Sequence, residues 1–136
     1  MATPARFEQF TLLVLVLVHL VVQLTHGYSH LAADVSLTAM QQVFIYVVAT
    51  FMPLAAVYVA LRKDVRLGAG LFAVSMAAAF LFGYLAHFFI ESPDLHSNVV
   101  GDYAALFFHS ALSLAIIEFV GFAFGFTIAT RKPRQE

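Results

Sequence analysis

Four long runs of apolar residues, separated by short polar breaks, dominate the chain. They cover about Phe7–His30, Thr38–Leu61, Leu67–Ile90 and Asp102–Thr130. Each run is long enough to cross roughly 30 Å of hydrocarbon as a helix that rises about 1.5 Å per residue. The pattern therefore predicts an all-α membrane protein, a four-helix transmembrane bundle that forms a single domain over residues 1–136.

The polar breaks carry structural signals of their own. The segment RKDVR separates the second run from the third, and ESPDLHSNVVGD separates the third from the fourth. Pro93 in the latter segment is expected to stop the third helix. Pro53 inside the second run predicts a kink, which membrane helices tolerate when neighbouring groups satisfy the freed carbonyl. The first run is expected to be a span, because its apolar core is longer than that of a secretory signal peptide.

The basic residues all fall on one side of the predicted topology. The chain has seven of them: Arg6, Arg62, Lys63, Arg66, Arg131, Lys132 and Arg134. With four spans, the N-terminus, the loop between spans two and three, and the C-terminus share one side, which the positive-inside rule makes cytoplasmic. The other side carries the acidic residues Asp34, Glu91, Asp94 and Asp102. We therefore predict a multi-pass protein of the cell membrane with both termini cytoplasmic.

Composition agrees with this topology and narrows the chemistry. The chain is 62% hydrophobic and only 11% charged, so the lipid bilayer is its expected solvent and first partner. It has no cysteine, which excludes disulfides and thiolate metal sites. It has no glycine-rich phosphate loop and no nucleophile elbow. The short basic segments are typical of orientation signals, and no nucleic-acid partner is expected.

Four histidines fall at one predicted depth in the membrane. His26 and His30 lie near the end of the first span, His87 near the end of the third, and His109 near the start of the fourth. All of these span ends lie on the outer side, and they agree in depth within about one or two helical turns. Because ionisable residues inside spans generally face the bundle interior and are functional, we expect the four to share a site.

The spacing of these histidines favours a transition metal. His26 and His30 stand at i and i+4, the spacing at which two imidazoles on one helix face reach the same ion. Added to them, His87 and His109 give a four-nitrogen ligand set that suits copper, iron or zinc. Candidates for further ligands, or for groups that orient the imidazoles, are Glu91, Asp102 and Tyr84. The prediction is an integral membrane metalloprotein with its site near the extracytoplasmic surface, for redox chemistry or metal handling; whether it is an enzyme stays open.

A b-type heme is the main alternative cofactor. His87 and His109, or a histidine of the first span, can serve as axial ligands, as in an electron-transfer protein or the membrane anchor subunit of a respiratory complex. The predicted outer side has no lysine or arginine to bind heme propionates, and its carboxylates would repel them. We therefore favour a bare ion. The simplest alternative for a single histidine near a span end is an interfacial position, above all for His30 and for His96 in the last loop.

Three polar residues lie deeper in the predicted spans. His19 and Gln23 belong to the first span and Glu118 to the fourth. They are expected to be buried polar groups or a proton relay, so a small proton- or cation-coupled transporter is the second alternative. Glu118 shares a helix face with Gly121 and Gly125, whose spacing lets helix backbones approach closely. This face is expected to pack within the bundle or between copies, so the chain is predicted to form a homo-oligomer or to join a larger membrane complex.

Overall fold

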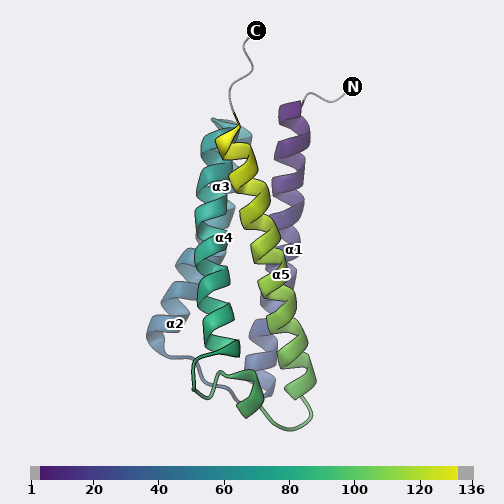
Figure 1. The fold of residues 1–136 in the computed structure, drawn as a ribbon, viewed down its shortest axis with the longest axis vertical. Helices are drawn as coiled ribbons and strands as arrows, with labels where there is room; N and C mark the ends of the chain where they lie inside the picture. Colours follow the sequence, from purple (N-terminus) through teal and green to yellow (C-terminus); the bar gives the residue numbers. More distant parts are fainter. Residues whose placement is uncertain (1–3, 132–136) are drawn as a thin grey trace.

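The computed structural model describes residues 4–131, which form helices joined by short connections and contain no strand within that range. The elements are α1 (Pro4–Ala32), α2 (Ala39–Phe44), the π-helix η1 (Ile45–Phe51), α3 (Met52–Arg62), α4 (Val65–Phe88), the 3₁₀ helix η2 (His96–Asn98) and α5 (Ala104–Thr130). Because α2, η1 and α3 are continuous, the described residues contain four helices long and apolar enough to cross a membrane, and these pack side by side (Figure 1). The predicted all-α, four-helix membrane bundle is confirmed.

Local capping interactions set several helix ends. Thr38 and Gln41 form a capping box at the start of α2, in which the Thr38 N–H donates to Gln41 Oε1 at 2.7 Å. Asp64 caps α4 by accepting the Leu67 N–H at 2.7 Å. At its other end α4 stops at Phe88, two residues earlier than the predicted span. The four spans otherwise begin and end within a few residues of the predicted boundaries.

The start of α1 and the end of α5 lie at the same end of the bundle (Figure 1). Arg131 there donates from Nη1 to Glu8 Oε1 at 2.6 Å. We call this the terminal end; the opposite end, which carries the connections 33–38 and 89–103, is the loop end. Two of the basic residues used to predict the orientation, Lys132 and Arg134, lie outside the described residues.

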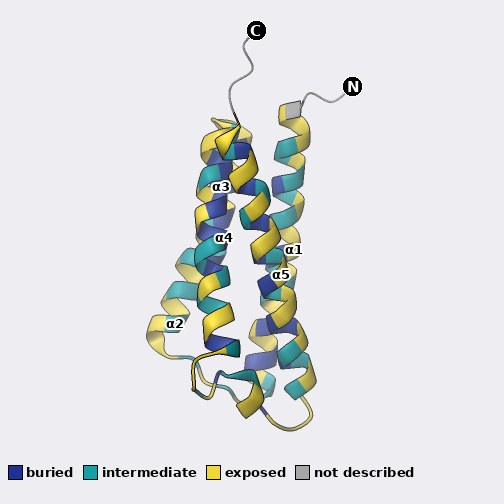
Figure 2. Ribbon diagram, viewed as in Figure 1, coloured by how far each residue is buried: buried dark blue, intermediate teal, exposed yellow. Residues whose placement is uncertain are grey.

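The tightest packing lies toward the terminal end. Its core consists of Leu12, Val16, Ala56, Val57, Ala60, Ala69, Phe72, Met76 and Ile128. A Cβ atom on Gly68 would come within 2.3 Å of the Ala60 backbone nitrogen, and one on Gly125 within 2.8 Å of the Ala69 carbonyl oxygen. Small residues thus bring the backbones of α3, α4 and α5 together, and the buried positions follow the faces where helices meet (Figure 2).

The glycine face of α5 packs within the chain. A Cβ atom on Gly121 would lie 3.0 Å from Met76 Cε, and Gly125 meets the backbone of α4. The close approach predicted for this face is therefore used between α4 and α5. Association with further copies of the chain would need another surface.

The second span changes its helix type just before Pro53, the second residue of α3. Proline lacks an N–H, and its ring clashes with the carbonyl four residues earlier in an α-helix. Here the preceding turn widens into the π-helix η1, in which the Met52 N–H bonds to the Val47 carbonyl, five residues back. The Thr50 hydroxyl also donates to the Ile45 carbonyl at 2.9 Å. The predicted kink takes the form of this π-helical turn, and α2 diverges from the other helices beyond it (Figure 1).

Candidate metal centre

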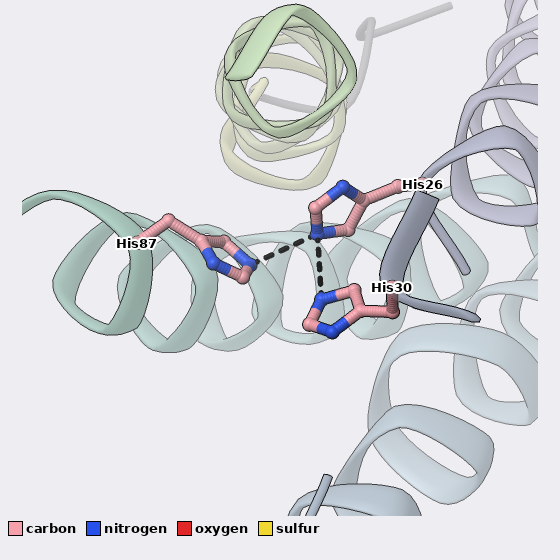
Figure 3. A group of neighbouring side chains, drawn as sticks. All are labelled: His26, His30 and His87. Atoms are coloured by element: carbon pink, nitrogen blue, oxygen red, sulfur yellow. Dashed lines mark hydrogen bonds between the residues drawn. The ribbon is translucent and has the colours of Figure 1, made fainter. Parts of the chain in front are cut away.

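Three buried histidines come together toward the loop end. His26 and His30 lie one turn apart on the same face of α1, and His87 lies in the last turn of α4 (Figure 3). His26 Nε2 is 3.0 Å from His87 Nε2 and 3.2 Å from His30 Nε2. One nitrogen from each residue lies within 4.8 Å of the other two. Two helices that are far apart in the sequence therefore aim three imidazoles at one point.

The outer nitrogens of two of these rings face backbone carbonyls. His30 Nδ1 donates to the Val35 carbonyl at 3.3 Å, and His87 Nδ1 donates to the Asp94 carbonyl at 3.0 Å. Because a carbonyl oxygen only accepts hydrogen bonds, each Nδ1 must carry the proton. The Nε2 of each neutral ring then presents a lone pair to the cluster.

The third ring is oriented by two serines. His26 Nδ1 lies 2.9 Å from Ser110 Oγ and 3.4 Å from Ser29 Oγ. Ser110 donates its own proton to the Phe107 carbonyl, and Ser29 donates to the His26 carbonyl. With their protons on carbonyls, both serine oxygens can accept from His26 Nδ1, and in this tautomer the His26 Nε2 is a third lone pair. Three converging lone pairs can ligate one cation. In the other tautomer the His26 Nε2–H donates to the neighbouring Nε2 atoms, along the contacts drawn in Figure 3.

The nitrogen separations suit a first-row transition metal. Two nitrogens bound tetrahedrally at about 2.0–2.1 Å from an ion lie about 3.3 Å apart. The two Nε2–Nε2 distances to His26, 3.0 and 3.2 Å, are close to that value. Three imidazoles leave a further coordination position for another ligand, as catalytic metal sites do.

Asp94 places a carboxylate at the edge of the cluster. It lies in the connection between α4 and α5 and is only 4% exposed. Its Oδ2 accepts from Gln41 Nε2 at 3.3 Å, whereas its Oδ1 has no hydrogen-bond partner among the described residues. Asp94 Oδ1 lies 3.4 Å from His30 Nε2 and 3.5 Å from His87 Nδ1. A buried carboxylate oxygen without a partner is costly, and a bound cation would remove that cost.

Phe107 covers the cluster from α5. Its side chain is fully buried, and its ring centroid lies 5.2 Å from that of His26, 4.9 Å from that of His30 and 5.3 Å from that of His87. The edge-to-face and tilted contacts restrict how each imidazole can rotate. The phenyl ring therefore packs against all three imidazoles and helps to hold them in place.

The structure does not bring His109 to the other three histidines. Ser110 faces inward from α5, and His109, one residue earlier, is turned by about 100° around the helix. His109 is exposed and borders a shallow pocket with Val22 and Thr25. The structure thus brings together three of the four predicted histidines, with the Asp94 carboxylate beside them.

The other residues predicted as additional ligands also lie away from the cluster. Glu91 Oε1 accepts from Asn98 Nδ2 at 2.8 Å on the exposed loop. Tyr84 is exposed and stacks on Phe80, with ring centroids 5.3 Å apart. Asp102 is exposed in the connection before α5. Neither these side chains nor their hydrogen bonds reach the three imidazoles.

A second buried polar site lies deeper in the bundle. His19 and Glu118 are both buried, and His19 Nε2 lies 3.2 Å from Glu118 Oε1. His19 precedes His26 by seven residues, which places it about 10 Å further along α1. Between them, Gln23 Nε2 donates to Thr50 Oγ1 at 2.9 Å and so joins α1 to η1. The polar residues predicted on the inward face of the first span therefore do meet partners on α5 and η1.

Four residues that the sequence analysis did not predict complete the site: Ser29, Asp94, Phe107 and Ser110. The spacing of Ser29, three residues after His26, was the one signal available for any of them. Phe107 and Ser110 could be found only once the rotation of α5 about its axis was known. Asp94 reaches the histidines because the loop folds back over the end of α4, which no local pattern predicts.

Comparisons with known proteins identify no relative of this chain. The chain matches no protein-family model, and no similar protein is found among the curated proteins or the solved structures. Its function therefore has to be derived from the chemistry of the site.

Proposed function

We propose that this chain is an integral membrane metalloprotein that binds one transition-metal ion, copper, iron or zinc, through His26, His30 and His87. The observation that carries the proposal is the convergence of three Nε2 atoms, each on a ring whose Nδ1 makes a hydrogen bond. Orienting contacts of this kind accompany ligating histidines and raise their basicity. The Asp94 carboxylate would act as a further ligand or as a counter-charge.

The site is proposed to lie near the extracytoplasmic surface of the cell membrane. The described basic residues fall at the terminal end: Arg6, Arg62, Lys63, Arg66 and Arg131. The positive-inside rule makes that end cytoplasmic, so the loop end with its histidines would face outward. The acidic residues at the loop end would then raise the local concentration of cations near the site.

A bare ion is favoured over heme on geometric grounds. The His26 and His87 rings are in edge contact, with centroids 4.7 Å apart and Nε2 atoms 3.0 Å apart. Two axial imidazoles would need a macrocycle between their nitrogens, and this contact leaves no gap for one. The cavity beside the histidines also has no lysine or arginine among its lining residues to pair with propionates.

The direct test is elemental analysis with a visible absorption spectrum on protein purified in mild detergent without chelator. About one transition metal per chain without a Soret band, the stoichiometry of a single three-histidine site, supports the proposal and identifies the metal. A Soret band with matching iron would replace it with a heme protein. Absence of both signals after copper, iron and zinc have each been offered back would refute metal binding.

Metal affinity should also depend on pH in one direction. Ligating imidazoles must be neutral, so protons compete with the metal as the pH falls through the histidine range. We expect affinity to fall steeply between about pH 8 and about pH 5. Titration with a competing chromophoric chelator across this range measures it. A flat profile would contradict ligation by histidine.

A proton- or cation-coupled transporter is the second candidate, and the His19–Glu118 pair is the observation that favours it. Both groups are buried near the middle of the bundle, and Glu118 also borders the cavity that reaches the histidine cluster. Ionisable pairs at this depth commonly serve ion pathways. Flux into proteoliposomes that is lost in Glu118→Gln, with metal binding retained, would favour transport; equal flux in both proteins would count against it.

A further inference from the structure

One large cavity opens beside the three histidines. It has a volume of about 770 Å³ and lies between α1, the α2–η1 segment and α4. It extends from Asp94 at the loop end to Glu118 near mid-bundle, and His26, His30 and His87 all line it. This volume is typical of small-molecule sites, which range over roughly 300–1,000 Å³.

The cavity is mainly apolar and opens on the outer surface of the bundle. Its walls include Leu20, Leu24, Leu31, Phe44, Ile45 and Phe82. Leu24 is 75% exposed and Leu31 is 82% exposed, so the mouth along α1 faces whatever surrounds the bundle. For a chain with four membrane-spanning helices, that surrounding is lipid. A ligand would therefore enter from the bilayer.

The charges around the cavity restrict the head group of such a ligand. Asp34, Asp94 and Glu118 line it, and none of its lining residues, all within the described part of the chain, is a lysine or arginine. An anionic head group would meet carboxylates without a basic partner. An uncharged hydroxyl or carbonyl oxygen has no such cost, and it can take the coordination position that three imidazoles leave on a metal.

We propose that this cavity binds an uncharged, lipid-soluble amphiphile whose hydroxyl or carbonyl oxygen lies at the histidine cluster and whose apolar part extends toward Glu118. The role of the head group rests on the proposed metal centre. The apolar walls and the lipid-facing mouth are features of the cavity alone. The ligand would reach the metal through the membrane, and not from the aqueous phase.

Gly27 provides a variant that fills the cavity without replacing a histidine ligand. It lines the cavity on α1, and a Cβ atom added there would meet nothing within 4 Å. Gly27→Phe should therefore place a ring in the cavity and keep the helix, since glycine is a poor helix former. Val21→Phe is the matched control, because Val21 is 65% exposed on the same helix and does not line the cavity. Ala49→Leu fills the cavity from the η1 wall and guards against a folding defect peculiar to the first variant.

The experiment is photolabelling of the full chain in phosphatidylcholine nanodiscs. The probe is a medium-chain alcohol with a diazirine at the end of the chain away from the hydroxyl, and labelled peptides are identified by mass spectrometry. Glu118 is only 2% exposed, so a probe labels it from within the cavity. Tyr58 on α3 is 60% exposed, does not line the cavity and reports probe in the surrounding lipid.

We expect Glu118 to be labelled in the wild type, and the ratio of Glu118 to Tyr58 labelling to fall about tenfold in Gly27→Phe and Ala49→Leu, equivalent to about 1.4 kcal/mol. The ratio should stay at the wild-type value in Val21→Phe. The corresponding fatty acid probe, which is anionic, should label Glu118 less than the alcohol does. No labelling of Glu118, or an unchanged ratio in both filled variants, would overturn the proposal.

Zinc loading separates this inference from the proposed metal function. Labelling of Glu118 is first measured without metal. It therefore tests whether the alcohol probe binds in the cavity even if the chain binds no metal. With zinc, Glu118 labelling should rise in the wild type and stay constant in His87→Ala, because the metal would hold the hydroxyl. Zinc binding with no rise in labelling would overturn the proposed contact between head group and metal.

Discussion

The two ends of the bundle are built on opposite principles. Toward the terminal end, small residues such as Gly68 and Gly125 bring three helices into backbone contact around an apolar core. Toward the loop end, a cavity lies between α1 and the α2–η1 segment, and it is bordered by imidazoles and carboxylates. The same four helices therefore supply close packing at one end and a polar site with an adjoining cavity at the other.

This difference suggests how a small membrane protein can contain buried ionisable groups. Helices in lipid associate through close van der Waals packing, which the glycine contacts of α3, α4 and α5 provide. Polar groups inside a membrane are costly unless each finds a partner. Here the costly groups are placed in the half of the bundle where packing is loose, and the tightly packed half stabilises the fold.

The largest effect is expected for a glycine substitution in the tightly packed half, compared with a glycine substitution in the loosely packed half. Gly68→Leu would drive a side chain into the Ala60 backbone, and we expect it to destabilise the fold by about 3 kcal/mol or more. Gly27→Leu meets no atom within 4 Å at its Cβ and should leave stability nearly unchanged. The fraction of monodisperse protein after heating in detergent measures both. Equal losses in the two variants would contradict the division of the bundle into a tight and a loose half.

The next largest effect concerns the ligands themselves. His87→Ala should weaken metal binding about 100-fold or more, because a structural site of four ligands is worth about 10–16 kcal/mol and each ligand carries a large share. His109→Ala is the matched control, and exposed positions away from a site usually change energies by less than about 0.5 kcal/mol. Competition titration with a chromophoric chelator gives both constants. A comparable loss in His109→Ala would return that residue to the ligand set.

The smallest predicted effect concerns the orientation of one ring. Ser110→Ala removes the acceptor 2.9 Å from His26 Nδ1, and loss of such an orienting contact typically costs about tenfold in metal affinity. Ser113→Ala, an exposed serine on the same helix, should have no effect. The same titration measures both variants. An unchanged affinity in Ser110→Ala would contradict an orienting role for Ser110 and leave the ring held by Ser29 and Phe107.

The sequence predicted the spans well because span length depends on one quantity, the number of consecutive apolar residues. The depth of the histidines followed from the same count along each helix. The rotation of a helix about its axis did not follow, because a helix in lipid is apolar on its outer face as well as on its inner one. On α5 the residues beside His109 are Phe108 and Ser110, and nothing in their hydrophobicity tells which of the three faces inward.

Two further features depended on contacts that local sequence does not encode. Pro53 predicted a distortion of the second span. A kink and a π-helical turn both accommodate a proline that lacks an N–H, and only the packing of the neighbouring helices selects between them. In the sequence Asp94 is only one of several acidic residues on the predicted outer side, and nothing marks it as part of the site. Its burial beside His30 depends on the path of the whole connection and on the contact with Gln41.

The π-helix η1 also preserves the angular phase of α2. A π-helical turn completes one revolution with one residue more than an α-helical turn. Removing one residue from Ile45–Phe51 would therefore leave Gln41 facing Asp94, whose Oδ2 it now holds. The restored α-helical turn would, however, bring the Pro53 ring against the carbonyl four residues earlier. A single-residue deletion at this point would thus strain the second span at Pro53 without changing which face of α2 turns toward the histidine cluster.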